Sequence, residues 1–336
     1  MRKEATLKQW EKLYDIAIKI KEMKPWEYLF DIDLITIMIP DRETICCSIM
    51  GSSEEFYGIG TYIGDDSIND FYQLLNTKEM PFIQTKRFQE DNLTICNFGN
   101  REELTSKELK LIKDLGLKFR GKNNWIYFHS YKRGYAPYIL DQEEVLLQIE
   151  VFENLYMALR AYIFEDLEVN FDEHYTLLRR YDHEDDLWLN YQSKIEIPKI
   201  YLKPEWTDEI YIANLNRAKR LKETWEMDIA YLNSIVKDKE YDRPIEVRVC
   251  VLFDKASKML INQEMLNPLG DQVQSVFDVL LEAILNLGKP TKIIVRDKYM
   301  FYILKDLCER INIKLEIKEK LPSVDSFVEE FVRDMR

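Results

Sequence analysis

The stretch from Gly116 to Leu140 combines the residue types that bind phosphate groups and nucleic-acid bases. It reads GLKFRGKNNWIYFHSYKRGYAPYIL and holds five basic residues, seven aromatic residues and no acid. Lysine and arginine neutralise phosphates, and aromatic rings stack on bases. The alternative is that WIYFHSY is a strand whose aromatics alternate into a core and whose flanking cations are solvated. The first interpretation makes these residues the candidate anion or nucleic-acid contacts: Lys118, Arg120, Lys122, Tyr131, Lys132 and Arg133.

A second stretch, TICCSIMGSSEEFYGIGTYIG (44–64), carries two adjacent cysteines and several glycines. A phosphate loop must leave a strand and open a helix at once, whereas Thr61 to Ile63 continue the strand here. Cys46 and Cys47 are neighbours in a predicted strand, so their side chains point to opposite faces and do not share a metal ion. We therefore expect sheet, with buried thiols and with glycines that allow close approach.

Histidines are too sparse to indicate a nucleophilic hydrolase or a metal centre. His174 and the HEDD turn (183–186) could ligate a divalent ion, but their spacing matches no established ligand pattern. A solvated acidic turn explains the same residues, so we predict no metal site there.

Composition indicates a two-domain protein of the reduced cytosol. The chain has 336 residues, no long apolar run, an N-terminus without the features of a signal peptide, and five scattered cysteines without a CxxC pair. The net charge of -13 disfavours a general nucleic-acid binder. Neither a membrane-bound nor a secreted protein is expected.

The negative charge is concentrated in one part of the chain. Residues 141–186 hold fourteen acidic residues against three arginines. Such a segment is suited to a basic partner, which indicates a protein–protein interaction.

Hydrophobic periodicity predicts an α+β domain followed by an α/β domain. A helix over 4–23 shows an apolar face at Leu7, Leu13 and Ile20, and strands over 33–40 and 44–51 form a hairpin. The polar segment VKDKEYDRP (236–244) predicts the domain boundary, which gives domains at 1–240 and 241–336. The N-terminal domain is expected to hold an antiparallel sheet, and the C-terminal domain a mixed sheet.

Two sets of motifs resemble an uncharacterised bacterial family built of two modules. The first is a Cys-Ser-x-x-Gly turn before a Tyr-Gly strand, at Cys47, Ser48, Gly51, Tyr57 and Gly58. The second is the run WIYFHSYKRGYAP, which departs from the family pattern at Ile126 and His129. The stretch after Arg243 resembles the second module. The resemblance implies an architecture and no activity.

The C-terminal order of hairpin, helix, strand, helix, strand and helix also resembles a shortened ribonuclease-H-like fold. Such folds place carboxylates on the first strand, the first helix, after the fourth strand and on the last helix, where they hold two cations about 3.5–4 Å apart. The resemblance implies a metal-dependent nuclease or phosphoesterase, with Mg²⁺ or Mn²⁺ bound by Asp254, Glu282, Asp297 and Asp325. A non-catalytic relative fits better, because Asp254 ends its strand and a third hairpin strand is missing. The sequence thus predicts a binding or interaction protein, with a metal-dependent nuclease or a non-cleaving nucleic-acid binder as the alternatives.

Overall fold

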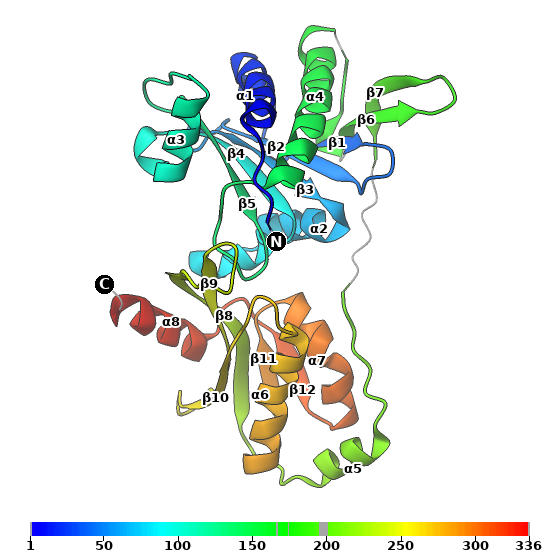
Figure 1. Cartoon of the computed structure of the whole chain (residues 1–336). Coiled ribbons are helices and arrows are strands. Elements are labelled where there is room, and N and C mark those ends of the chain that lie inside the picture. The colour runs from blue at the N-terminus through cyan, green and yellow to red at the C-terminus, as the bar shows by residue number, and fades with distance from the viewer. Residues whose placement is uncertain (1, 166, 174, 195–200, 335–336) are drawn as a thin grey trace. The chain divides into compact units, whose positions relative to one another are not determined.

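Two sheets organise the chain in the computed structural model, which describes residues 2–165, 167–173, 175–194 and 201–334 (Figure 1). Each sheet belongs to a separate unit. Unit 1 comprises Met1–Tyr72, Gln89–Lys132 and Pro137–Lys199, and unit 2 comprises Gln73–Phe88, Arg133–Ala136 and Ile200–Arg336. The chain therefore passes between the units more than once.

Unit 1 is built on a seven-stranded sheet with the order β5-β4-β3-β2-β1-β6-β7. Neighbouring strands are antiparallel, as predicted, except that β1 and β6 run parallel. The strands are β1 (Ile35–Met38), β2 (Ile45–Met50), β3 (Gly58–Ile63), β4 (Leu93–Gly99), β5 (Trp125–Tyr131), β6 (Thr176–Asp182) and β7 (Leu187–Ser193). The helices are α1 (Leu7–Glu22), α2 (Gly64–Asn76), α3 (Ser106–Asp114) and α4 (Gln142–Phe164), with short 3-10 turns at Pro25–Glu27, Arg101–Glu103 and Phe171–Glu173.

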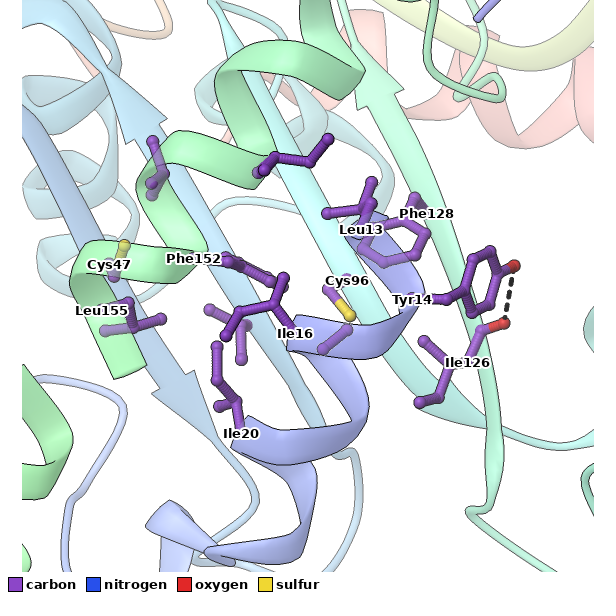
Figure 2. Packing of buried hydrophobic residues seen from close by; sticks show 14 of the residues in the cluster. Leu13, Tyr14, Ile16, Ile20, Cys47, Cys96, Ile126, Phe128, Phe152 and Leu155 are labelled. Atoms are coloured by element: carbon purple, nitrogen blue, oxygen red, sulfur yellow. Dashed lines mark hydrogen bonds between the residues drawn. The ribbon is translucent and has the colours of Figure 1, made fainter. Parts of the chain in front are cut away.

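Helices cover both faces of this sheet. On one face, Leu13 and Ile20 of α1 and Phe152 of α4 pack against strand residues such as Phe128 (Figure 2). The Tyr14 hydroxyl donates to the Ile126 carbonyl at 3.2 Å, which satisfies a polar group inside this core. On the other face, residues of α2 pack over the strands.

The CC pair behaves as its alternation predicts. Cys47 lies in the core under α1 and α4, and Cys46 lies in the core under α2. Burial raises the pKa of the Cys46 thiol to about 12, so the thiol stays protonated at neutral pH. At Gly58 the close approach is that of a neighbouring strand: a Cβ there would lie 2.9 Å from the carbonyl oxygen of Cys96 in β4.

Unit 2 has a five-stranded mixed sheet with the order β10-β9-β8-β11-β12. Its first three strands are antiparallel, and β8, β11 and β12 run parallel to one another. The strands are β8 (Thr224–Val236), β9 (Ile245–Asp254), β10 (Leu260–Met265), β11 (Lys292–Val295) and β12 (Lys314–Ile317). The helices are α5 (Glu209–Arg217), α6 (Gln272–Leu287), α7 (Lys298–Arg310) and α8 (Pro322–Asp334), together with the 3-10 segment η2 (Phe82–Phe88).

This topology is ribonuclease-H-like, because an antiparallel three-strand meander is followed by two parallel strands added on the side of its first strand. Helices α6 and α7 pack on one face, and α8 packs on the other. The missing third hairpin strand is β8.

The predicted boundary at 240/241 is corrected by this pairing. Strand β8 lies before that boundary, yet it is the central strand of unit 2. The polar segment over 236–244 is the connection of the β8–β9 hairpin, and polar hairpin connections and polar linkers have the same composition. Unit 2 also includes residues 73–88 and 133–136, which no local pattern separates from their neighbours in the chain.

The first testable prediction concerns the α1 face. Replacing fully buried Leu13 by alanine should lower the free energy of unfolding by about 2–5 kcal/mol, because a cavity replaces packed methyl groups. Leu7→Ala in the same helix is the matched control, because Leu7 is 52% exposed. The sequence predicts Leu7 on the buried apolar face of the helix, and the structure corrects that prediction. Urea denaturation checks this, and equal losses in the two variants would contradict the packing described.

Candidate functional site

The four predicted carboxylates divide into two groups. Asp254 ends β9 and accepts hydrogen bonds from the Ser257 amide and hydroxyl at 2.8 and 2.6 Å, as a turn residue does. Glu282 is exposed on α6 and accepts from Asn262 at 3.0 Å. Among the described residues, neither of them contacts Asp297 or Asp325.

Asp297 and Asp325 are instead brought to Asp228, a buried residue of β8. Strand β8 alternates, so Trp225, Met227 and Ile229 face α6 and α7 while Glu226 and Asp228 are on the side of α8. Asp297 follows β11 and caps α7, accepting from the Met300 amide at 2.8 Å. Asp325 lies in the first turn of α8 and accepts from the Leu321 amide at 3.0 Å.

Two arginines bind these three carboxylates together. We call the five residues Arg87, Asp228, Arg296, Asp297 and Asp325 the charge network. Arg296 donates to Asp228 Oδ2 at 2.5 Å and to Asp325 Oδ1 at 2.7 Å. Arg87 donates to Asp228 Oδ1 and Oδ2 at 3.0 and 3.2 Å, and its Nη1 also donates to Asp297 Oδ2 at 2.5 Å.

Arg87 reaches the charge network from η2, which lies against β8. The Gln84 side chain donates to the Tyr231 carbonyl at 3.1 Å and accepts from the Tyr231 amide at 3.2 Å. Arg87 donates to the Gln84 carbonyl and to the Ile229 carbonyl, both at 2.9 Å. These contacts satisfy backbone groups of β8 beyond the point where its pairing with β11 ends, at Met227.

The charge network is largely buried, and its charges shift the pKa values of its members. Asp228 and Arg296 are fully buried, and Arg87 and Asp297 are nearly so. Burial opposes ionisation of Asp228, but Arg296 and Arg87 outweigh it and hold its pKa below the usual value. Burial raises the pKa of Asp325, which has one guanidinium partner and lies near the charge of Asp228. Burial alone would lower the pKa of Arg87, but Asp228 and Asp297 raise it.

This arrangement does not fit the two divalent cations that the ribonuclease-H-like fold implies. A metal-ion pair needs carboxylate oxygens directed at the ions. Here all six carboxylate oxygens of Asp228, Asp297 and Asp325 already accept from a guanidinium or a backbone amide. No cluster of metal-ligating side chains occurs among the described residues.

The candidate nucleic-acid contacts of residues 116–140 are divided between the two units. Lys118, Arg120 and Lys122 are exposed on the turn before β5. Lys132 forms an ion pair with Glu144 at 2.7 Å, and burial raises the pKa of Tyr131 to about 12. Arg133 belongs to unit 2, where its guanidinium lies 5.4 Å from the centre of the Tyr299 ring.

The acidic turn at 183–186 is the β6–β7 connection. Asp186 accepts a hydrogen bond from Tyr181, and Asp182 accepts from the Glu184 amide at 2.9 Å. These are the contacts of a hairpin turn. His174, the other residue of that hypothesis, lies outside the described residues.

Sequence reasoning missed Asp228, Arg87 and Arg296. The alternation of WEMDIAYL (225–232) did carry a signal, because it places two acids on one face of an otherwise apolar strand. Arg87 had no such signal, since it pairs across 141 residues of sequence with Asp228.

The charge network predicts a large asymmetry between buried and exposed arginines. Arg87→Met and Arg296→Met should each lower the free energy of unfolding by about 3–5 kcal/mol. The first variant leaves Asp297 without its guanidinium partner, the second leaves Asp325 without one, and both remove one of the two partners of Asp228. Arg333→Met is the control, since Arg333 is 75% exposed and its ion pair with Asp334 is long, at 3.9 Å. Denaturant titration measures all three, and a loss for Arg87→Met no larger than the control's would contradict the network.

The lowered pKa of Asp228 predicts a pH dependence of defined sign. The charge of this residue stabilises the fold above its ordinary pKa of 3.8, and that stabilisation is lost as the pH falls through the lower folded value. The stability difference between the wild type and Asp228→Asn should therefore be largest near neutral pH and shrink below about pH 4. Urea unfolding at a series of pH values tests it, and a constant difference would refute the assignment.

Comparisons with known proteins agree with the two-module organisation. No curated protein matches the chain. Among solved structures, the catalytic core domain of BIV integrase is 15% identical over 34% of this chain and 67% of that chain, with a TM-score of 0.25. The HTLV-2 integrase catalytic core domain in complex with magnesium (dimeric form) is 17% identical over 35% of this chain and 74% of that chain, also with a TM-score of 0.25. These likenesses are slight, and the fold assignment of unit 2 rests on its own strand order.

Two family models match the chain, and both are described as domains of unknown function. Residues 211–332 match Domain of unknown function (DUF6930), and this match includes β8. Residues 10–179, just over half of the chain, match the other model. The chain therefore belongs to the family described as Domain of unknown function (DUF7309).

Proposed function

We propose that the protein is a non-catalytic binding protein, and that unit 2 is a ribonuclease-H-like module that does not cleave. The observation that carries this proposal is the occupation of all six oxygens of Asp228, Asp297 and Asp325. The guanidiniums of Arg87 and Arg296 supply the positive charge that cations supply in a two-metal site. A cation that entered would be repelled by both of them.

The free-energy cost of separating the arginines from the carboxylates supports the same conclusion. To bind a metal ion at Asp228, both arginines would have to give up their hydrogen bonds inside a buried region. A buried charge separated from its partner is strongly destabilising. The network therefore stabilises unit 2 in place of a catalytic centre, and a metal-dependent nuclease is the less favoured alternative.

Unit 1 offers a surface for a basic protein partner. Strand β7 is at the edge of the described sheet, and the β6–β7 turn next to it is acidic and exposed. An exposed edge can accept a further strand, and the acidic turn would favour a basic one. Other acids of the 141–186 segment already have partners, such as Glu150 with Arg42 and Glu153 with Lys12.

A location in the reduced cytosol is part of the proposal. All five cysteines are free and buried. In the part of the chain that the structure describes, no helix has the length and apolar character needed to cross a bilayer.

The proposal predicts that the full chain does not hydrolyse phosphodiesters. Labelled single-stranded and duplex DNA and RNA, incubated with the protein and Mg²⁺ or Mn²⁺, should remain intact on denaturing gels. A weak background from a contaminant would be unchanged in Asp228→Asn and Asp297→Asn. Cleavage that needs the metal and disappears in Asp228→Asn, with Asp254→Asn as the control outside the network, would overturn the proposal.

A further inference from the structure

Six basic residues gather where the parallel strands of unit 2 begin, at the end of the sheet opposite the charge network. The segment before β8 lies against the loop before β11: the Lys289 amide donates to the Lys219 carbonyl at 2.8 Å, and the Leu221 amide to the Lys289 carbonyl at 2.9 Å. The first residue of β12 joins them, because the Lys314 amide donates to the Thr291 carbonyl at 3.1 Å. We call this set the basic face: Arg217, Lys219, Arg220, Lys222, Lys289 and Lys314.

Close backbone contact fixes the arrangement. Gly288 has a φ of +115°, and a Cβ at this position would lie 2.4 Å from the Lys219 carbonyl oxygen. A side chain does not fit there, so the glycine allows Lys289 to lie beside Lys219 and Arg220. The cations are therefore brought together by the fold of unit 2.

The basic face lacks the acidic partners that other cations of unit 2 have. Lys292 pairs with Glu316, and Arg310 pairs with Glu209 and Asp306. None of the six residues of the basic face makes an ion pair with any residue that the structure describes.

Lys289 shows most clearly that the cations of the basic face lack acidic partners. The residue is 6% exposed, and its ammonium donates to two neutral acceptors, the Asn216 side chain at 3.0 Å and the Ile311 carbonyl at 3.1 Å. Burial lowers the pKa of Lys289, and the charge of Arg220 lowers it further. A bound anion would relieve the repulsion between these two cations.

We propose that the basic face binds the phosphate backbone of a nucleic acid. The inference deepens the proposed function, because it names the ligand class of a protein that binds without cleaving. Phosphates are recognised by lysine and arginine together with polar donors. The segment over residues 213–223 supplies four of the six cations, and it exposes no large apolar side chain of the kind that forms the centre of a protein interface.

The net charge of the chain does not by itself decide this binding. The chain carries -13 overall, and much of that charge is in residues 141–186. At an ionic strength of about 0.1 M, charges are screened beyond about 10 Å. A phosphate that contacts the basic face therefore responds mainly to charges within that distance, and not to the total charge of the chain.

The test uses the full chain and a fluorescein-labelled oligothymidylate of about twenty nucleotides, followed by fluorescence anisotropy over a range of NaCl concentrations. The wild type should bind, with an affinity that falls linearly with salt on logarithmic axes. The triple variant Lys219→Gln, Arg220→Gln, Lys222→Gln should lose at least about tenfold in affinity at low salt. The slope of its log affinity against log salt concentration should be shallower by about 2, because each of the three lost phosphate contacts contributes about 0.7 to the slope.

Unit 1 provides a matched control. The variant Lys118→Gln, Arg120→Gln, Lys122→Gln removes the same charge from an exposed turn, and it should retain the wild-type affinity. Equal losses of affinity in the two triple variants would mean that binding depends only on net charge, and this would overturn the proposal. Absence of binding by the folded wild type would also overturn it. Equally tight binding of a polyglutamate peptide would overturn it in favour of an acidic protein. Cleavage of the oligonucleotide with Mn²⁺ would instead contradict the proposed function, whatever the affinity.

Discussion

The carboxylate of Asp228 is the interaction on which unit 2 depends. It is fully buried in the central strand of the sheet, and both of its oxygens accept from guanidinium groups. An unpaired carboxylate at this position would be costly, so Arg87 and Arg296 are required wherever Asp228 is charged. Through these two arginines Asp228 is connected to Asp297 after β11, to Asp325 in the first turn of α8 and to η2.

The charge network is also the reason for proposing that a chain whose unit 2 has ribonuclease-H-like topology is a binding protein. The topology brings carboxylates from β8, from the end of β11 and from α8 to one place. Chemistry at such a place depends on what else is present, and here two arginines occupy the carboxylates. The fold therefore does not determine the function, because the same scaffold can hold either metal ions or guanidinium groups.

Local patterns in the sequence were sufficient to predict most elements of both sheets. The β1–β2 hairpin, the opposite orientations of Cys46 and Cys47, and the order of elements from β9 to α8 all follow from periodicity and turn residues. The domain boundary did not follow, because the polar connection between β8 and β9 has the composition of a linker. A boundary at 240/241 places β8 in the first domain, so β9 becomes the first strand of the second domain and Asp254 takes the place that belongs to Asp228.

The charge network itself was beyond sequence reasoning for a physical reason. Asp297 and Asp325 stood out as acids on suitable elements, but their partners are fixed by tertiary structure. Arg87 lies in a 3-10 segment that is flanked in the sequence by two segments of unit 1, and nothing local indicates that η2 packs on β8. A buried ion pair is a long-range contact, whereas periodicity reports which face of an element is buried.

The most direct test of this account is a crystal structure of the chain grown or soaked in manganese chloride, with an anomalous difference map. We predict that Arg87 and Arg296 keep their bonds to Asp228, Asp297 and Asp325, and that the map shows no peak among these carboxylates. A manganese ion coordinated by Asp228 and Asp297, with Arg87 displaced, would contradict the account and identify unit 2 as a metal-dependent catalytic module.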